Sequence, residues 1–305
     1  MAKTVSIGIC AYNEAQHIPA LLDSLQGQTL PPNFALTEIL VVASGCTDGT
    51  DRIIEERAEV ERRLTLVRES ARFGKSSAIN EILRRYRGDI LVLVNADARL
   101  LPGALYGLLE GFDGDDGVDL ACGLPSPEPS LSPILDVVER GWWRIHNRTL
   151  QTLSDLGAGN HCCDELMAMK RGFADSIPRD LLNDGSYFGV LGALRGRTVR
   201  FCPSAVVIVD TPSSLSGLLW QRRRILTGHH QVTGLLGRSP YTFEGLVLTG
   251  PAVAARILLS EFWERPAQTL AFLGIAGPLE LVSHLLSFVD RARNPGYQPA
   301  WPMVE

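Results

Sequence analysis

The sequence predicts an α/β fold built on a doubly wound sheet. The first hundred residues contain short, continuous apolar runs, amphipathic segments between them, and a regular alternation of the two. Such runs are typical of parallel strands covered by helices on both faces, and four consecutive units form half of a doubly wound sheet. Length and composition agree with this class. A chain of 305 residues with 45% apolar and 21% charged side chains can bury a large core and is unlike a disordered chain.

Strands are expected at residues 5–11, 39–43, 64–67 and 90–94, and helices at about 15–27, 50–62, 76–86 and 103–112. The pattern then changes at a proline-rich loop over 125–133. Beyond it we expect a helix that carries Trp142 and Trp143, a loop and strand over 157–171, and a basic helix around 221–231.

Charge and cysteine usage exclude several classes of protein. The 34 acidic residues outnumber the 29 Lys and Arg, for a net charge of -5, which argues against a general nucleic-acid binder. The mean hydropathy of +0.07 argues against a polytopic membrane protein. The six cysteines lack the paired spacing of a zinc site, and the N-terminus lacks a signal-peptide pattern. These features predict a reduced, cytoplasmic location.

Polar turns follow all four expected strands. They contain Tyr12 to Glu14, Ser44 to Thr50, Gly74 to Ser76, and Asn95 with Asp97. Taken singly, each turn is explained by helix capping, with Asn13 and either Thr47 or Asp48 as caps. Together they lie where doubly wound sheets bind ligands, at the carboxyl ends of the strands. Gly74-Lys75-Ser76 lacks the upstream glycine of a Walker A loop. Asp97 beside an amide suits Mg²⁺ or Mn²⁺.

The ordered set of motifs resembles the inverting family 2 glycosyltransferases of the GT-A fold. The matching segments are AYNE at 11–14, SGCTDGT at 44–50, GKSSAIN at 74–80, NAD at 95–97 in place of DxD, GAGNHCCDELMAMKR at 157–171, LND at 182–184 and QRRRI at 221–225. The resemblance covers about residues 3–232. It implies a GT-A (Rossmann-like) doubly wound mixed sheet flanked by helices, with a helical C-terminal extension.

The resemblance also implies how the chain is divided. Residues 1–235 would form one glycosyltransferase domain, with a nucleotide-sugar-binding half at 1–120 and an acceptor-binding half at 121–235. Residues 236–305 would form the helical extension. The implied reaction moves a sugar from a nucleotide-sugar, with a UDP-sugar as the first expectation, to an acceptor hydroxyl with inversion. It would depend on Mn²⁺ or Mg²⁺, and the acceptor would be a carbohydrate, a lipid-linked molecule or a small molecule.

The resemblance assigns roles to individual residues. Asp184 would be the general base. Donor-binding residues would be Ala11, Tyr12, Glu14, Ser44, Lys75, Asn95, Asp97, Gln221 and Arg224. Asp97 would hold the metal, with His229 as a second candidate ligand. Lys75 and the arginines at 222–224 would gather positive charge around the donor diphosphate.

Three departures from the family pattern bear on the donor, the metal and the product. Ala43 and Ser44 stand where members often carry an acid that reads uracil. Asn95 replaces the first acid of DxD, and Ile225 replaces the tryptophan of QxxRW. A catalytically weak nucleotide-binding or scaffold module is therefore one alternative. A sugar-phosphate nucleotidyltransferase is another, although it would need a glycine-rich basic loop after the first strand.

The segment 270–289 is apolar and about as long as a bilayer is thick. Glu280 and His284 would be costly inside a membrane. Polar residues recur at three- and four-residue spacing, at Gly277, Glu280, Ser283, His284, Ser287 and Arg291. This pattern predicts an amphipathic helix packed on the catalytic domain, on a second subunit, or in the membrane interface. Flanking arginines favour the last, which would place the protein at the inner face of the membrane.

Overall fold

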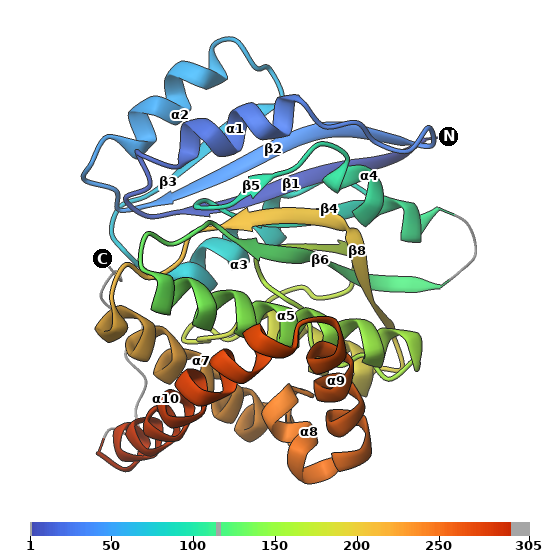
Figure 1. Ribbon diagram of the computed structural model, residues 1–305. Helices are drawn as coiled ribbons and strands as arrows, with labels where there is room; N and C mark the ends of the chain where they lie inside the picture. Colours follow the sequence, from blue (N-terminus) through green and yellow to red (C-terminus); the bar gives the residue numbers. More distant parts are fainter. Residues whose placement is uncertain (1, 114–116, 294–305) are drawn as a thin grey trace.

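The computed structural model describes residues 2–113 and 117–293. Its centre is one eight-stranded sheet of order β3-β2-β1-β4-β7-β6-β8-β5 (Figure 1). The strands are β1 Lys3–Ala11, β2 Phe34–Ser44, β3 Leu64–Glu69, β4 Ile90–Asn95, β5 Arg99–Leu100, β6 Val118–Pro127, β7 Leu166–Lys170 and β8 Thr198–Val209. The first four are parallel, β7 runs antiparallel to β4 and β6, and β5 runs antiparallel to β8. The predicted mixed, doubly wound sheet is confirmed.

Helices cover both faces of the sheet because successive strand residues point to opposite sides. On one face, Ile7 and Ile9 of β1 pack with α1 (Ile18–Gln26), α2 (Thr50–Ala58) and α4 (Ala104–Leu109). On the other face, Leu91 and Leu93 of β4 pack with α3 (Lys75–Arg85) and α6 (Asp184–Leu194). A short 3₁₀ helix, Glu110–Phe112, follows α4. With both faces buried, the strands need the continuous apolar runs that predicted them.

The expected elements are found, with differences at their ends. The second strand begins at Phe34, five residues before the expected start, because its first half alternates in exposure and so lacks a continuous apolar run. The first helix begins at Ile18, and its N-cap is His17, not Asn13. The division expected near residue 120 falls inside β6.

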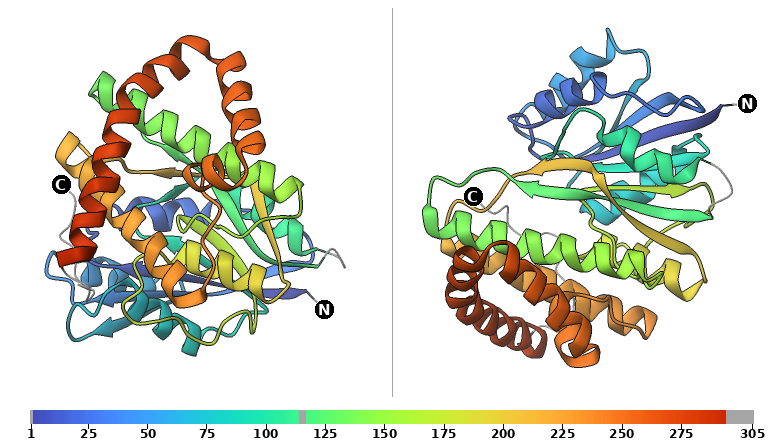
Figure 2. Two further views of the ribbon diagram at one scale, coloured as in Figure 1. Left: turned by 90° about the horizontal axis from the view of Figure 1, so that it is seen from below. Right: turned by 45° about the vertical axis from the view of Figure 1, so that its right-hand side comes forward.

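A layer of helices lies below the sheet in the view of Figure 1. It consists of α5 (Pro133–Asp155), α7 (Leu215–Leu236), α8 (Phe243–Thr249), α9 (Pro251–Glu264) and α10 (Pro266–Arg293). Figure 2 shows α9 and α10 crossing α5 and α7. Gly141 of α5 permits a close approach, since a Cβ there would stand 2.0 Å from the ring of Phe272. Arg144 and Arg148 of α5 pair with Glu261, which is buried on α9. The helical extension therefore shares a core with α5, and its residues 294–305 lie outside the described part of the chain.

Two phenylalanines on α10 test this packing. Phe272 is 6% exposed in the core with α5, whereas Phe288 is 64% exposed on the outer side. We expect Phe272→Ala to lower the free energy of unfolding by about 3–5 kcal/mol through lost contacts and a cavity. Phe288→Ala should stay within about 0.5 kcal/mol. Urea unfolding measures both, and equal losses would contradict this arrangement.

Candidate active site at the ends of the parallel strands

Side-chain bonds join the loops that follow β1 and β2. Asn13, with a left-handed φ of 55°, accepts a hydrogen bond from Thr47 N through Oδ1 at 2.8 Å. Asp48 Oδ2 accepts from Ala15 N at 2.9 Å, and Glu14 N donates to Thr50 Oγ1 at 2.8 Å. Asn13 and Asp48 thus hold one loop against the other, and the capping interpretation of Asn13 is wrong.

The loop after β2 also lies tightly against the loop after β3. Gly45 has a φ of +65°, and a Cβ at this position would come within 2.6 Å of the backbone of Ala71 and Arg72. Ser44 is buried, and its Oγ donates to Glu69 Oε2 at 2.5 Å. The same oxygen accepts from Phe73 N at 3.2 Å. Ser44 therefore supports the loop after β2, and its hydroxyl group already forms hydrogen bonds within the protein.

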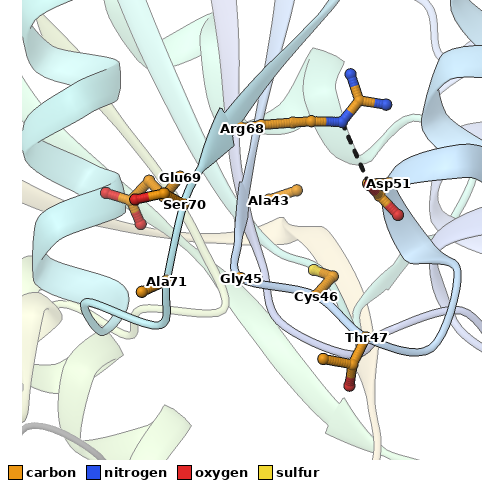
Figure 3. Close-up of a pocket in the computed structure, with 9 residues that line it drawn as sticks. All are labelled: Ala43, Gly45, Cys46, Thr47, Asp51, Arg68, Glu69, Ser70 and Ala71. Carbon is orange, nitrogen blue, oxygen red and sulfur yellow. Dashed lines mark hydrogen bonds and ion pairs between the residues drawn. The ribbon is translucent and has the colours of Figure 1, made fainter.

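A pocket of about 250 Å³ opens at these two strand ends (Figure 3). It is lined by Ala43, Gly45, Cys46, Thr47, Asp51, Arg68, Glu69, Ser70 and Ala71. Arg68 and Asp51 form one wall, with 3.3 Å between Nε and Oδ2. On the β1 side, the Arg72 guanidinium stacks 4.0 Å from the centre of the Tyr12 ring. The pocket lies between loops that offer small side chains and exposed backbone, which lets a ligand approach closely.

A charged cluster occupies the ends of the neighbouring elements. Lys75 is the first residue of α3, Asp184 the first residue of α6, and Asp164 lies just before β7. Lys75 Nζ is 2.8 Å from Asp164 Oδ2 and 3.1 Å from Asp184 Oδ1. Asp184 is only 4% exposed. One ammonium therefore serves two carboxylates that come from distant parts of the chain.

This arrangement tunes the two acids differently. Burial raises the pKa of Asp184 to about 6; Lys75 opposes the rise and Asp164 adds to it. For Asp164, burial also favours the neutral form, but the Lys75 ammonium and the Arg224 charge hold its pKa below the usual range. Asp184 is the more basic of the two carboxylates. It can both stay ionised at neutral pH and accept a proton.

Asn95 and Asp97 lie at the end of β4 and have different surroundings. Asn95 Nδ2 donates to Glu165 Oε2 at 2.5 Å, and its backbone N donates to Glu165 O at 3.2 Å. Burial raises the pKa of Glu165 to about 8, with Asp164 and Asp97 contributing. Asp97 is exposed. The amide of Asn95 thus supports the residue that precedes β7, and burial raises the pKa of Asp97.

Asp210 follows directly after β8, although the motifs did not include it. Burial raises the pKa of Asp97, and the charge of Asp210 adds to this rise. His17 contacts both Asp210 and Glu14. Its Nε2 lies 2.9 Å from Asp210 Oδ2, and its Nδ1 lies 2.7 Å from Glu14 Oε2. Asp210 follows the apolar run at 205–209, so the pattern that selected the other four strand ends would have found it.

His229 does not join these acids. Its ring lies edge-on to that of His161, at 5.4 Å between centroids, and His161 lies similarly against His146. Burial holds the pKa of His229 well below its ordinary value. Within residues 2–113 and 117–293, no group of three or more His, Cys, Asp or Glu side chains is arranged to hold a metal ion. His229 therefore lies in a cluster of histidine rings, and its role as a metal ligand beside Asp97 stays a prediction.

The basic helix α7 places its arginines on different sides. Arg222 pairs with Glu280 at 2.6 Å and Glu244 at 3.0 Å, and Arg223 pairs with Asp290 at 2.6 Å. Both point to the C-terminal helices, so the expected cluster of three arginines at the site is wrong. Arg224 is exposed and acts on Asp164. Gln221 lies one turn earlier on the same helix.

Lys75 contacts Asp164 and Asp184, and the Arg224 charge acts on Asp164. Asn95 bonds Glu165, and the charge of Asp97 acts on the same carboxyl group. His17 contacts Glu14 and Asp210, and the Asp210 charge acts on Asp97. Ala11 ends β1, Tyr12 follows it, and the Ala11 carbonyl accepts a bond from Cys46 Sγ of the pocket. The Ser44 hydroxyl bonds within the neighbouring loop, and the His229 ring lies against His161.

Comparisons with known proteins agree with this layout. Residues 6–177 match the family model of glycosyl transferase family 2. Poly-beta-1,6-N-acetyl-D-glucosamine synthase of Staphylococcus aureus is 24% identical over 73% of this chain and 54% of its own length. Undecaprenyl-phosphate 4-deoxy-4-formamido-L-arabinose transferase of Klebsiella pneumoniae is 26% identical over 57% of this chain and 51% of its own length. The chain thus spans about half the length of these curated relatives.

Solved structures support the fold. A mannosyltransferase of Pyrobaculum calidifontis in complex with GDP-Man and Mn²⁺ superposes with a TM-score of 0.61 at 24% identity, covering 98% of this chain and 82% of that one. Glucosyl-3-phosphoglycerate synthase of Mycobacterium tuberculosis, in complex with Mn²⁺, UDP and phosphoglyceric acid, gives 0.52 at 19% identity, covering 76% and 79%. With a family model that matches more than half of its length, this GT-A chain belongs to glycosyl transferase family 2.

Proposed function

We propose that this chain transfers a sugar from a nucleotide-sugar to an acceptor hydroxyl with inversion, and that Asp184 is the general base. The observation that carries the proposal is the buried Asp184 carboxylate held 3.1 Å from Nζ of Lys75, a residue inside the segment that matches the family model. A scaffold module would have no need for a buried carboxylate whose pKa is raised by burial and lowered by a neighbouring ammonium.

The proposed mechanism follows from the charges. The acceptor hydroxyl lies against Asp184, which takes its proton as the oxygen attacks the anomeric carbon. Lys75 keeps Asp184 ionised beforehand and, at the N-terminus of α3, faces the donor diphosphate together with free helical N–H groups. Attack comes from the face opposite the leaving diphosphate, so one displacement inverts the configuration. Gln221 and Arg224 of α7 close over the diphosphate.

A divalent cation fits the acidic side chains at the end of β4. Asp97 is exposed, and the charge of Asp210, which follows β8, acts on it. Mg²⁺ and Mn²⁺ commonly bind one or two carboxylates together with substrate phosphates, so a third protein ligand is not required. When bound, the ion would offset the negative charge that grows on the leaving nucleoside diphosphate. Mn²⁺ in the complexes of the mannosyltransferase and the phosphoglycerate synthase supports this assignment.

Glu69 supplies the acid that the end of β2 lacks. Family members often carry a uracil-reading carboxylate where Ala43 and Ser44 stand here. Glu69 lines the pocket from the next strand, and its carboxylate is fixed by hydroxyls of Ser44 and Ser77, at 2.5 Å and 2.8 Å. A carboxylate accepts an N–H hydrogen bond strongly. We therefore keep a UDP-sugar as the proposed donor, with Glu69 reading the base.

The acceptor and the location are proposed from the cysteines and from the curated relatives. All six cysteines are free thiols, as in a reduced cytoplasmic compartment. The names of the curated relatives include a polysaccharide synthase and an undecaprenyl-phosphate transferase. We propose a cytoplasmic enzyme whose acceptor is a growing carbohydrate, a lipid-linked molecule or a small molecule.

The deciding assay is release of nucleoside diphosphate from a panel of UDP- and GDP-sugars with Mn²⁺ or Mg²⁺. We expect release from a UDP-sugar that stops with a chelator and returns with added metal. Asp97→Ala should reduce it by at least about a hundredfold, because the leaving charge loses its counter-ion. Asp113→Ala, an exposed acid at the far end of the sheet, serves as the control. Nucleotide binding without any turnover, unchanged in Asp184→Asn, would favour the scaffold alternative.

The pH dependence of kcat/KM tests Asp184 as the base. Its pKa is raised to about 6, and only the ionised form accepts a proton, so activity should rise with pH and level off above this value. Lys75→Gln removes a charge that lowers this pKa, so the rise should move to higher pH. Asp164→Asn removes a charge that raises it, so the rise should move to lower pH. Shifts in the same direction would contradict the assignment.

Glu69→Gln tests the reading of the base. Loss of a charge-assisted bond should weaken UDP binding roughly tenfold while GDP binding, measured by calorimetry, changes less. Ser70→Ala, in the same pocket, is the matched control. Equal losses for both nucleotides would mean that Glu69 only supports the loop.

A further inference from the structure

The helix α10 buries several polar side chains and exposes many of its apolar ones. Its buried positions include Thr269, Ser283 and Ser287, all polar and at most 1% exposed. A helix on the surface of a soluble domain ordinarily buries its apolar stripe and exposes its polar one. Here Glu280, Ser283 and Ser287 of the polar stripe turn inward in the half of α10 that packs on α7.

Specific polar contacts fix this orientation. Glu280 accepts two bonds from Arg222 of α7, at 3.0 Å and 2.6 Å. Asp290 pairs with Arg223, and the hydroxyl of Ser287 lies 3.1 Å from that of Thr227. These contacts span the C-terminal half of α10. Phe272 and Ala276 anchor the N-terminal half in the core with α5.

The apolar side chains consequently face away from the protein. On α10 the outward residues include Leu270, Leu273, Leu281, Leu285 and Phe288, which are 39–64% exposed. On α9, Leu259 and Trp263 continue the surface, at 55% and 78% exposed. Figure 2 shows these two helices on the side of the helical layer that lies away from the sheet. We call this set of seven residues the outer apolar face. Contiguous exposed apolar surface of this kind marks a site of association.

The charged residues beside this face are mainly basic. Among the described side chains of α9, α10 and the residue between them, those that are exposed and fully charged at neutral pH are Arg256, Glu264 and Arg265. Glu264 is paired with Arg148 at 2.6 Å. A surface of leucines and aromatic residues with arginines at its margin suits a bilayer that carries anionic headgroups.

The same contacts exclude a spanning arrangement for this conformation. By length and composition α10 is the one helix of the described residues that would suffice to cross a membrane. Crossing would detach Glu280 and Asp290 from their arginines and place both carboxylates in hydrocarbon, at high cost. Lying in the interface requires no contact to break. We propose that the outer apolar face of α9 and α10 docks this protein on the surface of an anionic lipid bilayer, with the catalytic sheet in the aqueous phase. This inference does not depend on the proposed reaction.

Flotation of the full chain with lipid vesicles tests the proposal. We expect binding to vesicles of phosphatidylcholine mixed with phosphatidylglycerol, and weaker binding to phosphatidylcholine alone. The double variant Leu281→Gln/Leu285→Gln should lose at least about tenfold in partitioning, because both side chains leave the apolar phase. Arg256→Gln/Arg265→Gln should remove the preference for anionic vesicles. Val60→Gln/Leu194→Gln, also at exposed apolar positions but on α6 and the α2–β3 connection, should bind as the unmodified chain does.

Three outcomes would overturn it. The first is a chain that binds neither kind of vesicle, and the second is vesicle binding that the Leu281/Leu285 variant retains. The third is a dimer, detected by light scattering, that the same variant dissolves in the absence of lipid, since a second copy would then cover the face. An unchanged unfolding temperature and retained nucleotide binding in the variant show that folding and the proposed donor site are intact, so a failure here is separable from a failure of the proposed function.

Discussion

The candidate site depends on one ammonium shared by two carboxylates. Asp164 precedes β7, Asp184 begins α6, and Lys75, which contacts both, begins α3. Without a cation between them, two carboxylates in a largely buried position would repel, and one would take up a proton. Lys75 therefore holds the segment before β7 against the start of α6 and leaves Asp184 the more basic of the two acids. Burial alone would neutralise Asp184, and the ammonium alone would leave it too weak a base to be useful.

The fold could be predicted where a strand is buried on both faces. β1 and β4 are continuous apolar runs because helices cover both sides, so their positions follow from the sequence. Prolines and polar residues interrupt β6 and the first part of β8, so these two strands were not foreseen over their full lengths. The antiparallel direction of β7 depends on how the chain returns after α5, and no local pattern encodes it. Long-range pairing, not residue preference, fixes these features.

For the site, the sequence predicted the positions of the polar residues better than it predicted the residues to which they bond. Polar residues after strands were found because strand ends are visible in a periodic pattern. Ser44 bonds to Glu69 and Asn95 bonds to Glu165. Both hydrogen bonds depend on the register of neighbouring strands. The expectation that Arg222 and Arg223 join Arg224 at one diphosphate conflicts with helix geometry. Successive residues on a helix point about 100° apart, so three consecutive arginines do not face one diphosphate.

The orientation of α10 follows from the same helix. Because α7 turns Arg224 toward Asp164, its other arginines must face the opposite layer, where a buried guanidinium needs a carboxylate. Glu280 and Asp290 of α10 meet this need, and their shared stripe is thereby drawn inward. The leucines of α10 are left outside, although composition alone would assign them to a core. One helix thus places the Arg224 charge near Asp164 and, through its other side, determines which surface of α10 is exposed.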